Sequence, residues 1–291
     1  MAIDRKVKVA GITFDYRLLA IVPVILLIFS VAALTSKYVS TGDWFDRSVE
    51  LRGGTLLTIK TQQAVSAAAI EAALGNQFGD VVVRGMRGFG EYGATIQVDS
   101  SADYKAMLEE LKAGGINITD FSIENTGSSL SSMFWSQAQM AIVLAFIFMG
   151  IITFIVFKKV ATSLTTMFTA IADMVVTLAF MNIFGIQFTL ASLGALLMML
   201  GYSVDTDIML NSRILKDSTG KVGERVGGAV KTGLTMTATS LAAVGAILIA
   251  PVPEALIGIA SVLFIGLSAD IINTWMFNSV MLRWYYESKG V

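Results

Sequence analysis

The sequence contains no cysteine and no histidine among its 291 residues. Disulfides and thiol chemistry are therefore excluded, and so are the usual zinc sites, which draw on these two residue types. Histidine is also the commonest proton carrier near neutral pH. Aspartate and glutamate remain as the candidates for proton handling, and we expect neither a metal site nor a cofactor.

Charged residues are scarce as well. They make up 15% of the chain, against roughly a quarter of an ordinary soluble domain, while 55% of the residues are hydrophobic. A soluble fold could not bury so much apolar side chain, so a lipid bilayer is the expected surrounding. The formal net charge of −1 gives no overall field that would attract nucleic acid, and no nucleic acid is expected as a partner.

Six apolar stretches approach or exceed the ~20 residues that a helix needs to cross a membrane. These predicted spans are Leu18–Leu34, Ala138–Phe157, Leu164–Ile183, Phe188–Leu210, Leu234–Ala250 and Leu256–Leu282. The first is predicted to be a retained anchor rather than a signal peptide, because no small-residue cleavage pattern follows it. The predicted organisation is a segment 1–17, a first transmembrane helix 18–37, a domain outside the membrane 38–130, five more helices 131–282 and a tail 283–291.

Lysine and arginine residues near the spans predict the orientation, because cytoplasmic loops carry the positive excess. The basic residues that fall on one side are Arg5, Lys6, Lys8, Arg17, Lys158, Lys159, Arg213, Lys216, Lys221, Arg225, Lys231, Arg283 and Lys289. The turns on the other side, Gly185–Gln187 and Pro251–Glu254, contain none. We therefore expect a multi-pass protein of the cytoplasmic membrane, with both termini in the cytoplasm and residues 38–130 on the extracytoplasmic side.

Between the first two spans the hydrophobic pattern changes from continuous to alternating, which predicts a small α+β domain. Its predicted strand, helix, strand, strand, helix and strand are Thr55–Lys60, Ala64–Leu74, Asp80–Met86, Ala94–Asp99, Ala102–Ala113 and Asn117–Ile123. This is the βαββαβ order of a ferredoxin-like fold. Helix ends are expected at Gly75 and Gly114, a hairpin at Gly85–Gly93, and a tight turn at Gly53 and Gly54.

Four aspartates fall within the predicted spans: Asp173 in the third, Asp205 and Asp207 in the fourth, and Asp270 in the sixth. An acidic residue at a helix centre costs ~2.5 to 3.5 kcal/mol on insertion scales, so such residues usually face a wet cavity or a partner and mark function. Because a carboxyl group removed from water resists ionisation, an aspartate in a membrane can bind and release protons near neutral pH. The four are candidates for a proton or ion relay, and the alternative is that they only bond neighbouring helices together.

Helical spacing constrains how the two acids of the fourth span can act. Positions 205 and 207 differ by ~200° around a regular helix. Asp205 and Asp207 therefore cannot both face one cavity, so either one of them points elsewhere or the helix is broken there.

Polar residues also recur along the last two spans. In the sixth, Asn273, Thr274 and Asn278 extend a stripe that begins at Asp270. In the fifth, threonines recur at similar spacing and Lys231 lies near the cytoplasmic start; these residues are Thr232, Thr235 and Thr239. We expect Asn273, Lys231 and Thr235 to support the relay.

Three segments resemble the SecF family, which belongs to the resistance-nodulation-division group of transporters. They are VELRGGT (Val49 to Thr55), GYSVDTDIML (Gly201 to Leu210) and KTGLTMTATSL (Lys231 to Leu241). The layout of one span, an outside domain and five more spans matches as well, so the resemblance covers nearly the whole chain. Bacterial members read like GYSVNDT in the fourth span, which places the family's aspartate at Thr206 here, flanked by acids on both sides. That departure is typical of the archaeal form.

The resemblance implies partners and a function. It implies a complex with SecD, a related and larger subunit, and association with the Sec translocon and with translocating polypeptides. It also implies a role in protein translocation across or into the cytoplasmic membrane, with the proton or other ion gradient as the energy source. Thr206, at the position of the family's aspartate, is then expected to support the relay, and Lys231 takes the place of the basic residue, commonly arginine, that opens the span-five motif.

Two other functions remain open from the sequence. One is a subunit of a lipid or small-molecule exporter of the same superfamily, although such exporters usually carry two large outside domains and a duplicated bundle. The other is a passive membrane assembly factor whose aspartates only hold helices together. An enzyme is not expected, because no nucleophile, base and orienting residue can be grouped from the sequence.

Overall fold

The computed structural model describes residues 6–9, 12–61, 65–78, 81–87, 92–98, 102–216 and 222–288. The chain divides into two compact units, Met1–Asp46 with Ala141–Val291, and Arg47–Met140. The predicted residues that lie outside the described ones are Arg5, Ala64, Asp80, the middle of the Gly85–Gly93 hairpin, Asp99, Lys221 and Lys289.

Six helices of the described chain are long and apolar enough to cross a membrane. They are α1 (Ile21–Thr41, entered through the 3₁₀ helix η1, Tyr16–Ala20), α5 (Ser128–Phe157), α6 (Val160–Ile183), α7 (Leu190–Lys216), α8 (Val222–Ile249) and α9 (Glu254–Ile272), which runs on through η2 (Asn273–Asn278) and α10 (Ser279–Ser288). The six predicted spans are confirmed. Most of the helices run further than their apolar cores, because hydropathy marks only the part of a helix that lipid would cover.

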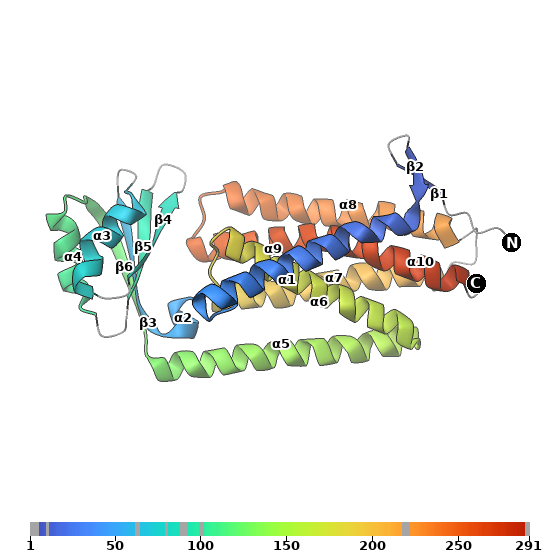
Figure 1. The fold of residues 1–291 in the computed structure, drawn as a ribbon, viewed down its shortest axis with the longest axis horizontal. Helices are drawn as coiled ribbons and strands as arrows, with labels where there is room; N and C mark the ends of the chain where they lie inside the picture. Colours follow the sequence, from blue (N-terminus) through green and yellow to red (C-terminus); the bar gives the residue numbers. More distant parts are fainter. Residues whose placement is uncertain are drawn as a thin grey trace. The chain divides into compact units, whose positions relative to one another are not determined.

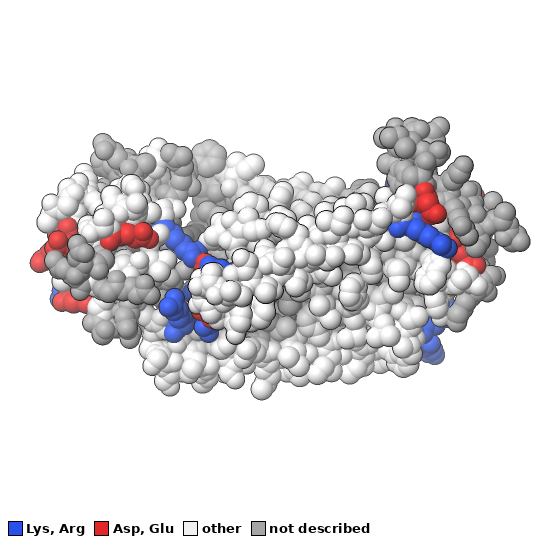
Figure 2. Space-filling model, viewed as in Figure 1, with Lys and Arg blue, Asp and Glu red and all other residues white. Residues whose placement is uncertain are grey.

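The long helices drawn in Figure 1 differ in the share of their residues that is buried. In α6 and α7, 56% of the most apolar window is buried, against 11% in α1 and α8 and 17% in α5. Large apolar side chains such as Ile25, Ile28, Phe148 and Ile155 are exposed on the outer helices. Figure 2 shows the middle of the helices uncharged on the face drawn, as expected of a surface in contact with lipid.

The helices η1 and α10 contact each other at one end of the bundle. Tyr16 of η1 is buried and donates its hydroxyl to Oε2 of Glu287 in α10 at 2.9 Å. Arg283 lies over the Tyr16 ring at 4.0 Å and pairs with Oε1 of Glu287 at 2.8 Å. Lys159, at the start of α6, lies 4.9 Å from the ring of Tyr286. Basic residues that the sequence assigns to one side thus meet at the same end of the helices.

The segment ahead of the first span contains structure that the sequence analysis did not predict. Strands β1 (Lys6–Val9) and β2 (Ile12–Asp15) pair in antiparallel fashion. Asp15 then caps η1 by accepting a hydrogen bond from the backbone N–H of Arg17 at 3.1 Å. The described part of the predicted segment 1–17 thus contains two paired strands and the start of η1.

The second unit contains a four-stranded antiparallel sheet and two longer helices. Its elements are the short helix α2 (Val49–Arg52), β3 (Gly54–Thr61), α3 (Ala67–Phe78), β4 (Val82–Arg87), β5 (Tyr92–Val98), α4 (Tyr104–Ala113) and β6 (Ile118–Thr126). The strands lie in the order β4-β5-β3-β6. Alternating residues of β3 and β5 and one face of each helix form the core, which includes Leu57, Ile59, Ile70, Ile96 and Met107. The predicted sequence of elements is confirmed, with shifts at their ends.

Glycines mark two of the predicted boundaries, and a third predicted boundary is wrong. Gly53 and Gly54 have φ of +86° and +130° and form the turn between α2 and β3. The α4 helix is capped at Gly114 and the chain leaves through Gly115 at φ +81°, as expected for a left-handed helix end. Gly75 does not end its helix, because α3 continues to Phe78.

Candidate functional site

Three of the four membrane aspartates lie inside the bundle, each on a different span. Asp173 of α6, Asp207 of α7 and Asp270 of α9 are all fully buried. Asp205 is exposed. Because α7 is one continuous helix here, the ~200° between positions 205 and 207 sends only one of the two inward. The alternative of a broken helix is wrong.

Both oxygens of the Asp173 carboxylate accept hydrogen bonds from other helices. Ser203 of α7 donates to Oδ2 and Asn273 of η2 donates to Oδ1, each at 2.7 Å. Thr177 donates to the backbone carbonyl of Asp173 at 2.6 Å. The carboxylate thus links three spans through two polar side chains.

Asp207 and Asp270 share one hydroxyl group. Thr274 Oγ1 lies 2.9 Å from Oδ1 of Asp270 and 3.3 Å from Oδ1 of Asp207. Thr206 Oγ1 lies 3.3 Å from Oδ2 of Asp270 and 2.8 Å from the carbonyl oxygen of Ser203. A hydroxyl carries one proton to donate, so each threonine can serve only one of its two acceptors at a time.

Asp207 is the acid whose bonding is incomplete. Asn278 of η2 donates to its Oδ1 at 2.6 Å, and Asn211 donates to its backbone carbonyl at 2.8 Å. The other carboxylate oxygen, Oδ2, is buried without a hydrogen-bond partner among the described residues. The same holds, within that part of the chain, for Thr166 Oγ1, Asn211 Oδ1 and Asn278 Oδ1.

The three acids lie near one another without a compensating base. The Thr274 hydroxyl lies between Asp207 and Asp270. The Thr206 hydroxyl lies between Asp270 and the backbone carbonyl of Ser203, whose side chain donates to Asp173. In the described part of the chain, no lysine or arginine forms an ion pair with any of them. Burying several uncompensated charges together is costly, which makes these three acids the candidate site of the chain.

The helix of the sixth span has a wider turn beside these acids. Residues Asn273–Asn278 form a π-helix, a rare conformation with i→i+5 hydrogen bonds that is frequent at functional sites. In an α-helix, side chains five residues apart point ~140° away from each other. The wider turn lets Asn273 and Asn278, which both lie in the interior, reach acids on two different helices.

The supporting residues predicted from the sequence divide into two pairs. Thr206 and Asn273 are buried in the cluster. Lys231 and Thr235 of α8 are exposed, and Thr235 donates to the backbone carbonyl of Lys231 at 2.9 Å. The structure therefore does not bring these two α8 residues to the buried acids.

Three polar residues of the cluster were not singled out in the sequence. Ser203 and Asn211 stand four residues before and after Asp207, and Thr166 stands seven before Asp173. These are the helical spacings that identified the stripe in the sixth span. Polar residues at these spacings from the acids of the third and fourth spans are Thr166, Ser203 and Asn211.

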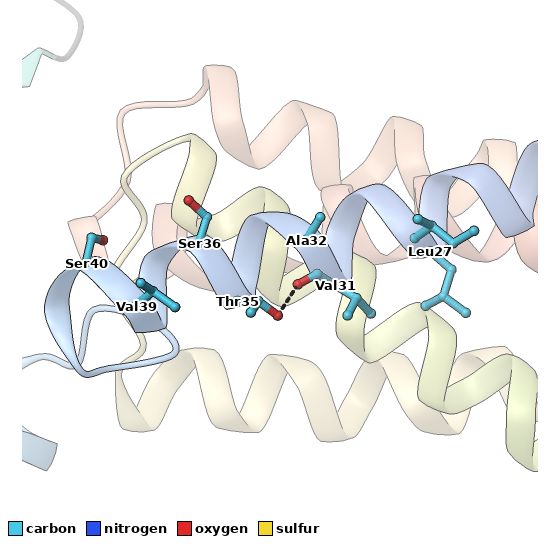
Figure 3. Close-up of a pocket in the computed structure, with 8 residues that line it drawn as sticks. Leu27, Val31, Ala32, Thr35, Ser36, Val39 and Ser40 are labelled. Atoms are coloured by element: carbon cyan, nitrogen blue, oxygen red, sulfur yellow. Dashed lines mark hydrogen bonds between the residues drawn. The ribbon is translucent and has the colours of Figure 1, made fainter.

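A groove of about 880 Å³ lies along α1 (Figure 3), and none of the four membrane aspartates lines it. It is lined only by α1 residues, among them Leu27, Val31, Ala32 and Val39. Thr35 in this groove donates to the carbonyl oxygen of Val31 at 2.8 Å. The groove is an apolar helix face and offers no chemistry.

Comparison with known proteins decides the family. The family model for the C-terminal part of the protein-export membrane proteins SecD and SecF matches residues 104–288. The protein-export membrane protein SecF of Methanothermobacter thermautotrophicus is 37% identical over 252 residues, which cover 84% of this chain and 86% of that protein. SecF of Pyrococcus furiosus is 34% identical over 288 residues, 99% of this chain and 96% of its own.

The chain belongs to the SecF family.

Solved structures show the same fold within a longer protein chain. The crystal structure of SecDF, a translocon-associated membrane protein from Thermus thermophilus, matches with a TM-score of 0.78 and 17% identity. The match covers 94% of this chain and 38% of the SecDF chain. SecDF in a super-membrane-facing form matches with a TM-score of 0.62 over all of this chain and 40% of its own. The SecF fold thus corresponds to well under half of SecDF.

Proposed function

We propose that this chain is the SecF subunit of a SecDF-type complex that assists Sec-dependent protein translocation across or into the cytoplasmic membrane. Membership of the SecF family supports this function. The chain covers only 38% of the SecDF chain it matches, so a SecD partner is proposed to supply the rest. Curated relatives named for protein export favour this function over that of a lipid or small-molecule exporter.

The proposed topology places the sheet-containing unit outside the cell, with a ferredoxin-like fold. The strand order β4-β5-β3-β6, joined through α3 and α4, supports that fold. The contact between Tyr16 and Glu287 supports a common side for the two termini. The basic residues Arg17, Lys159 and Arg283 gather at this end, which the positive-inside rule assigns to the cytoplasm.

Ion coupling is proposed to run through Asp173, Asp207 and Asp270. The observation that carries it is a group of three buried acids on three spans with no base paired to them in the described chain. Adding or removing a proton changes a carboxyl group between donor and acceptor. Thr206 and Thr274 can then turn their hydroxyls toward different acceptors, which changes the bonds between α7 and the sixth span.

Asp205 is proposed to face the SecD partner. Its side chain is exposed on α7 and makes no hydrogen bond or ion pair with any described residue. An unpaired carboxylate facing lipid is costly, so this face is expected to be covered by protein or to line a water-filled cavity. Tyr202 and Ser240, whose hydroxyls lie 2.8 Å apart, add polar groups between α7 and α8.

The test is export by single and double variants of the buried acids. Asp207→Asn, Asp270→Asn and their combination are expected to reduce export to the level seen without the chain, while SecD still co-purifies. Asparagine keeps the size of the side chain but cannot take up a proton. Full export in all three variants would contradict ion coupling through these acids.

A passive structural role is the second candidate, and one observation favours it. Five of the six carboxylate oxygens in the cluster have hydrogen-bond donors in the described chain, and only Oδ2 of Asp207 lacks one. If the acids only hold helices together, the asparagine variants should lose thermal stability and SecD association together with export. Loss of export from a stable, assembled complex separates the two functions.

A further inference from the structure

The turn between α5 and α6 carries an isolated pair of positive charges. Lys158 and Lys159 are the two residues that join these helices, and no other charged residue occurs between Glu124 and Asp173. Both lysines are exposed. Within the part of the chain that the structure describes, no carboxylate forms an ion pair with either of them. The charge of this lysine pair is therefore not compensated by the described chain.

The backbone at Lys158 is unfavourable for a lysine. Its φ is +52°, and among the described residues it is the one residue other than glycine with a positive φ. Its N–H donates to the carbonyl oxygen of Phe154 at 2.8 Å, so it occupies the position after a helix where glycine is most common. A Cβ atom strains the left-handed backbone, and glycine would remove that strain. A lysine retained here indicates that its charge has a use.

The second lysine is positioned by an aromatic ring. The Lys159 ammonium group lies 4.9 Å from the ring centre of Tyr286 in α10. The Tyr286 hydroxyl in turn lies 2.9 Å from the hydroxyl of Thr162. A cation over the face of a ring is held by the charge distribution of the ring, so the ammonium keeps its hydrogen-bond donors for another acceptor. The turn lies at the end of the first unit where α10 also ends (Figure 1).

Apolar side chains that point outward flank the lysine pair on both helices. Phe154 and Ile155, in the last turn of α5, are 49% and 64% exposed. Val160 and Leu164, at the start of α6, are 61% and 59% exposed. In a membrane protein such a surface is in contact with lipid tails. Two exposed lysines directly beside it therefore lie at the depth of the lipid headgroups, which long basic side chains reach from the end of a span.

Charge determines which headgroups fit this surface. A zwitterionic headgroup carries its own positive group beside the phosphate, so two lysines add little attraction. The phosphate of an anionic headgroup has no such partner and attracts basic residues at the membrane surface. Phosphate dissolved in water offers the same chemical group, but the apolar flanks of the turn favour a phosphate that is attached to lipid tails.

We propose that Lys158 and Lys159 bind the phosphates of anionic phospholipids and so hold the α5–α6 turn in the headgroup layer of the membrane. This surface goes beyond the proposed function, because neither a SecD partner nor the buried acids contribute to it.

The test is binding of single lipid molecules to the purified full-length chain in a neutral detergent, measured by native mass spectrometry. The probes are phosphatidylglycerol, which is anionic, and phosphatidylcholine, which is zwitterionic. We expect tighter binding of phosphatidylglycerol by the wild type. Lys158→Gly and Lys159→Gln should each weaken it about fivefold, the contribution of one basic residue near an anionic surface, and the double variant about 25-fold.

Three further measurements serve as controls. Lys158→Arg keeps the charge and should bind phosphatidylglycerol like the wild type. Lys112→Gln removes an exposed lysine from α4 of the second unit and should leave binding unchanged. Lys158→Gly should unfold in neutral detergent at or above the wild-type temperature, because glycine adopts a positive φ without strain. Lys159→Gln leaves residue 158 unchanged, so it tests the same surface if Lys158→Gly fails to fold.

Three results would overturn the proposal. One is equal affinity of the wild type for the two lipids. Another is phosphatidylglycerol binding by the double variant that is as tight as that of the wild type. The third is displacement of phosphatidylglycerol from the wild type by an equal concentration of inorganic phosphate at constant ionic strength, which would show a site for free phosphate rather than a lipid surface.

Discussion

Asn273 donates from Nδ2 to Oδ1 of Asp173 at 2.7 Å, which links the π-helix of the sixth span to the acid of the third. Both side chains are buried. Asn273→Ala removes the donor and leaves a buried carboxylate oxygen unsatisfied. The expected result is a loss of about 1–3 kcal/mol in the free energy of unfolding, measured by denaturant titration of the purified chain in detergent.

Ser268→Ala is the control for this variant, because Ser268 is only partly buried and, among the described residues, its hydroxyl bonds to the carbonyl oxygen of Phe264 on its own helix. Its stability is expected to stay within about 0.5 kcal/mol of wild type. Equal stability of Asn273→Ala and Ser268→Ala would show that the bond to Asp173 contributes nothing.

Gly233 of α8 is expected to be intolerant of any side chain. A Cβ atom at this position would overlap the Trp275 ring of η2 and would lie 2.9 Å from Cε of Met209. Gly233→Ala should therefore destabilise the chain by about 1–3 kcal/mol through overpacking. Gly228→Ala, on the same helix with open space around it, should be neutral or stabilising by up to about 1 kcal/mol. Thermal unfolding of the two variants side by side checks this, and a Gly233→Ala midpoint at or above that of Gly228→Ala would contradict it.

In the second unit, Gly54 is the glycine that we expect to tolerate no side chain. Its φ is +130°, and a Cβ atom would lie 2.6 Å from the carbonyl oxygen of Val98. Gly54→Ala should destabilise this unit by about 1–3 kcal/mol, because the backbone would be strained. The readout is faster limited proteolysis within residues 47–140. Gly85→Ala, where no atom lies within 4 Å, should be cleaved at the wild-type rate, and identical rates for both variants would count against the strain.

The contact between η1 and α10 depends on Glu287. It accepts from Tyr16 at 2.9 Å and from Arg283 at 2.8 Å. Glu287→Ala leaves the largely buried Arg283 guanidinium without this partner, and we expect a loss of about 1–3 kcal/mol in stability. The neighbouring Ser288→Ala provides the comparison, since Ser288 is exposed and bonds only within its helix. If the two variants unfold at the same denaturant concentration, the contact between η1 and α10 does not stabilise the bundle.

The sequence predicts the spans and the arrangement of the second unit well, because both follow from hydrophobic periodicity. Long apolar runs are typical of membrane helices, and alternation of apolar and polar residues is typical of strands. Gly75 misled the prediction, since a glycine inside a helix costs only about 1 kcal/mol and α3 continues past it to Phe78.

The candidate site could be predicted only in part. The ~200° between positions 205 and 207 around the helix excludes that both side chains face one cavity. It does not show which of the two faces inward. Nothing in the local sequence marks the π-helix at Asn273–Asn278, because an i→i+5 turn is fixed by packing against other helices. Sequence spacing finds residues that share a helix face, but it does not show which faces of different helices meet.

The bonds around the three acids also limit how the bundle can move. A slide of α7 by one residue shifts its side chains by ~1.5 Å, whereas a hydrogen bond tolerates a spread of only about 0.5 Å in length. Ser203, Thr206 and Asp207 are bonded to neighbouring spans from the same stretch of α7, so such a slide would break their contacts together. Helix sliding in this protein is therefore expected to occur as an all-or-none step between two registers, with no stable halfway position.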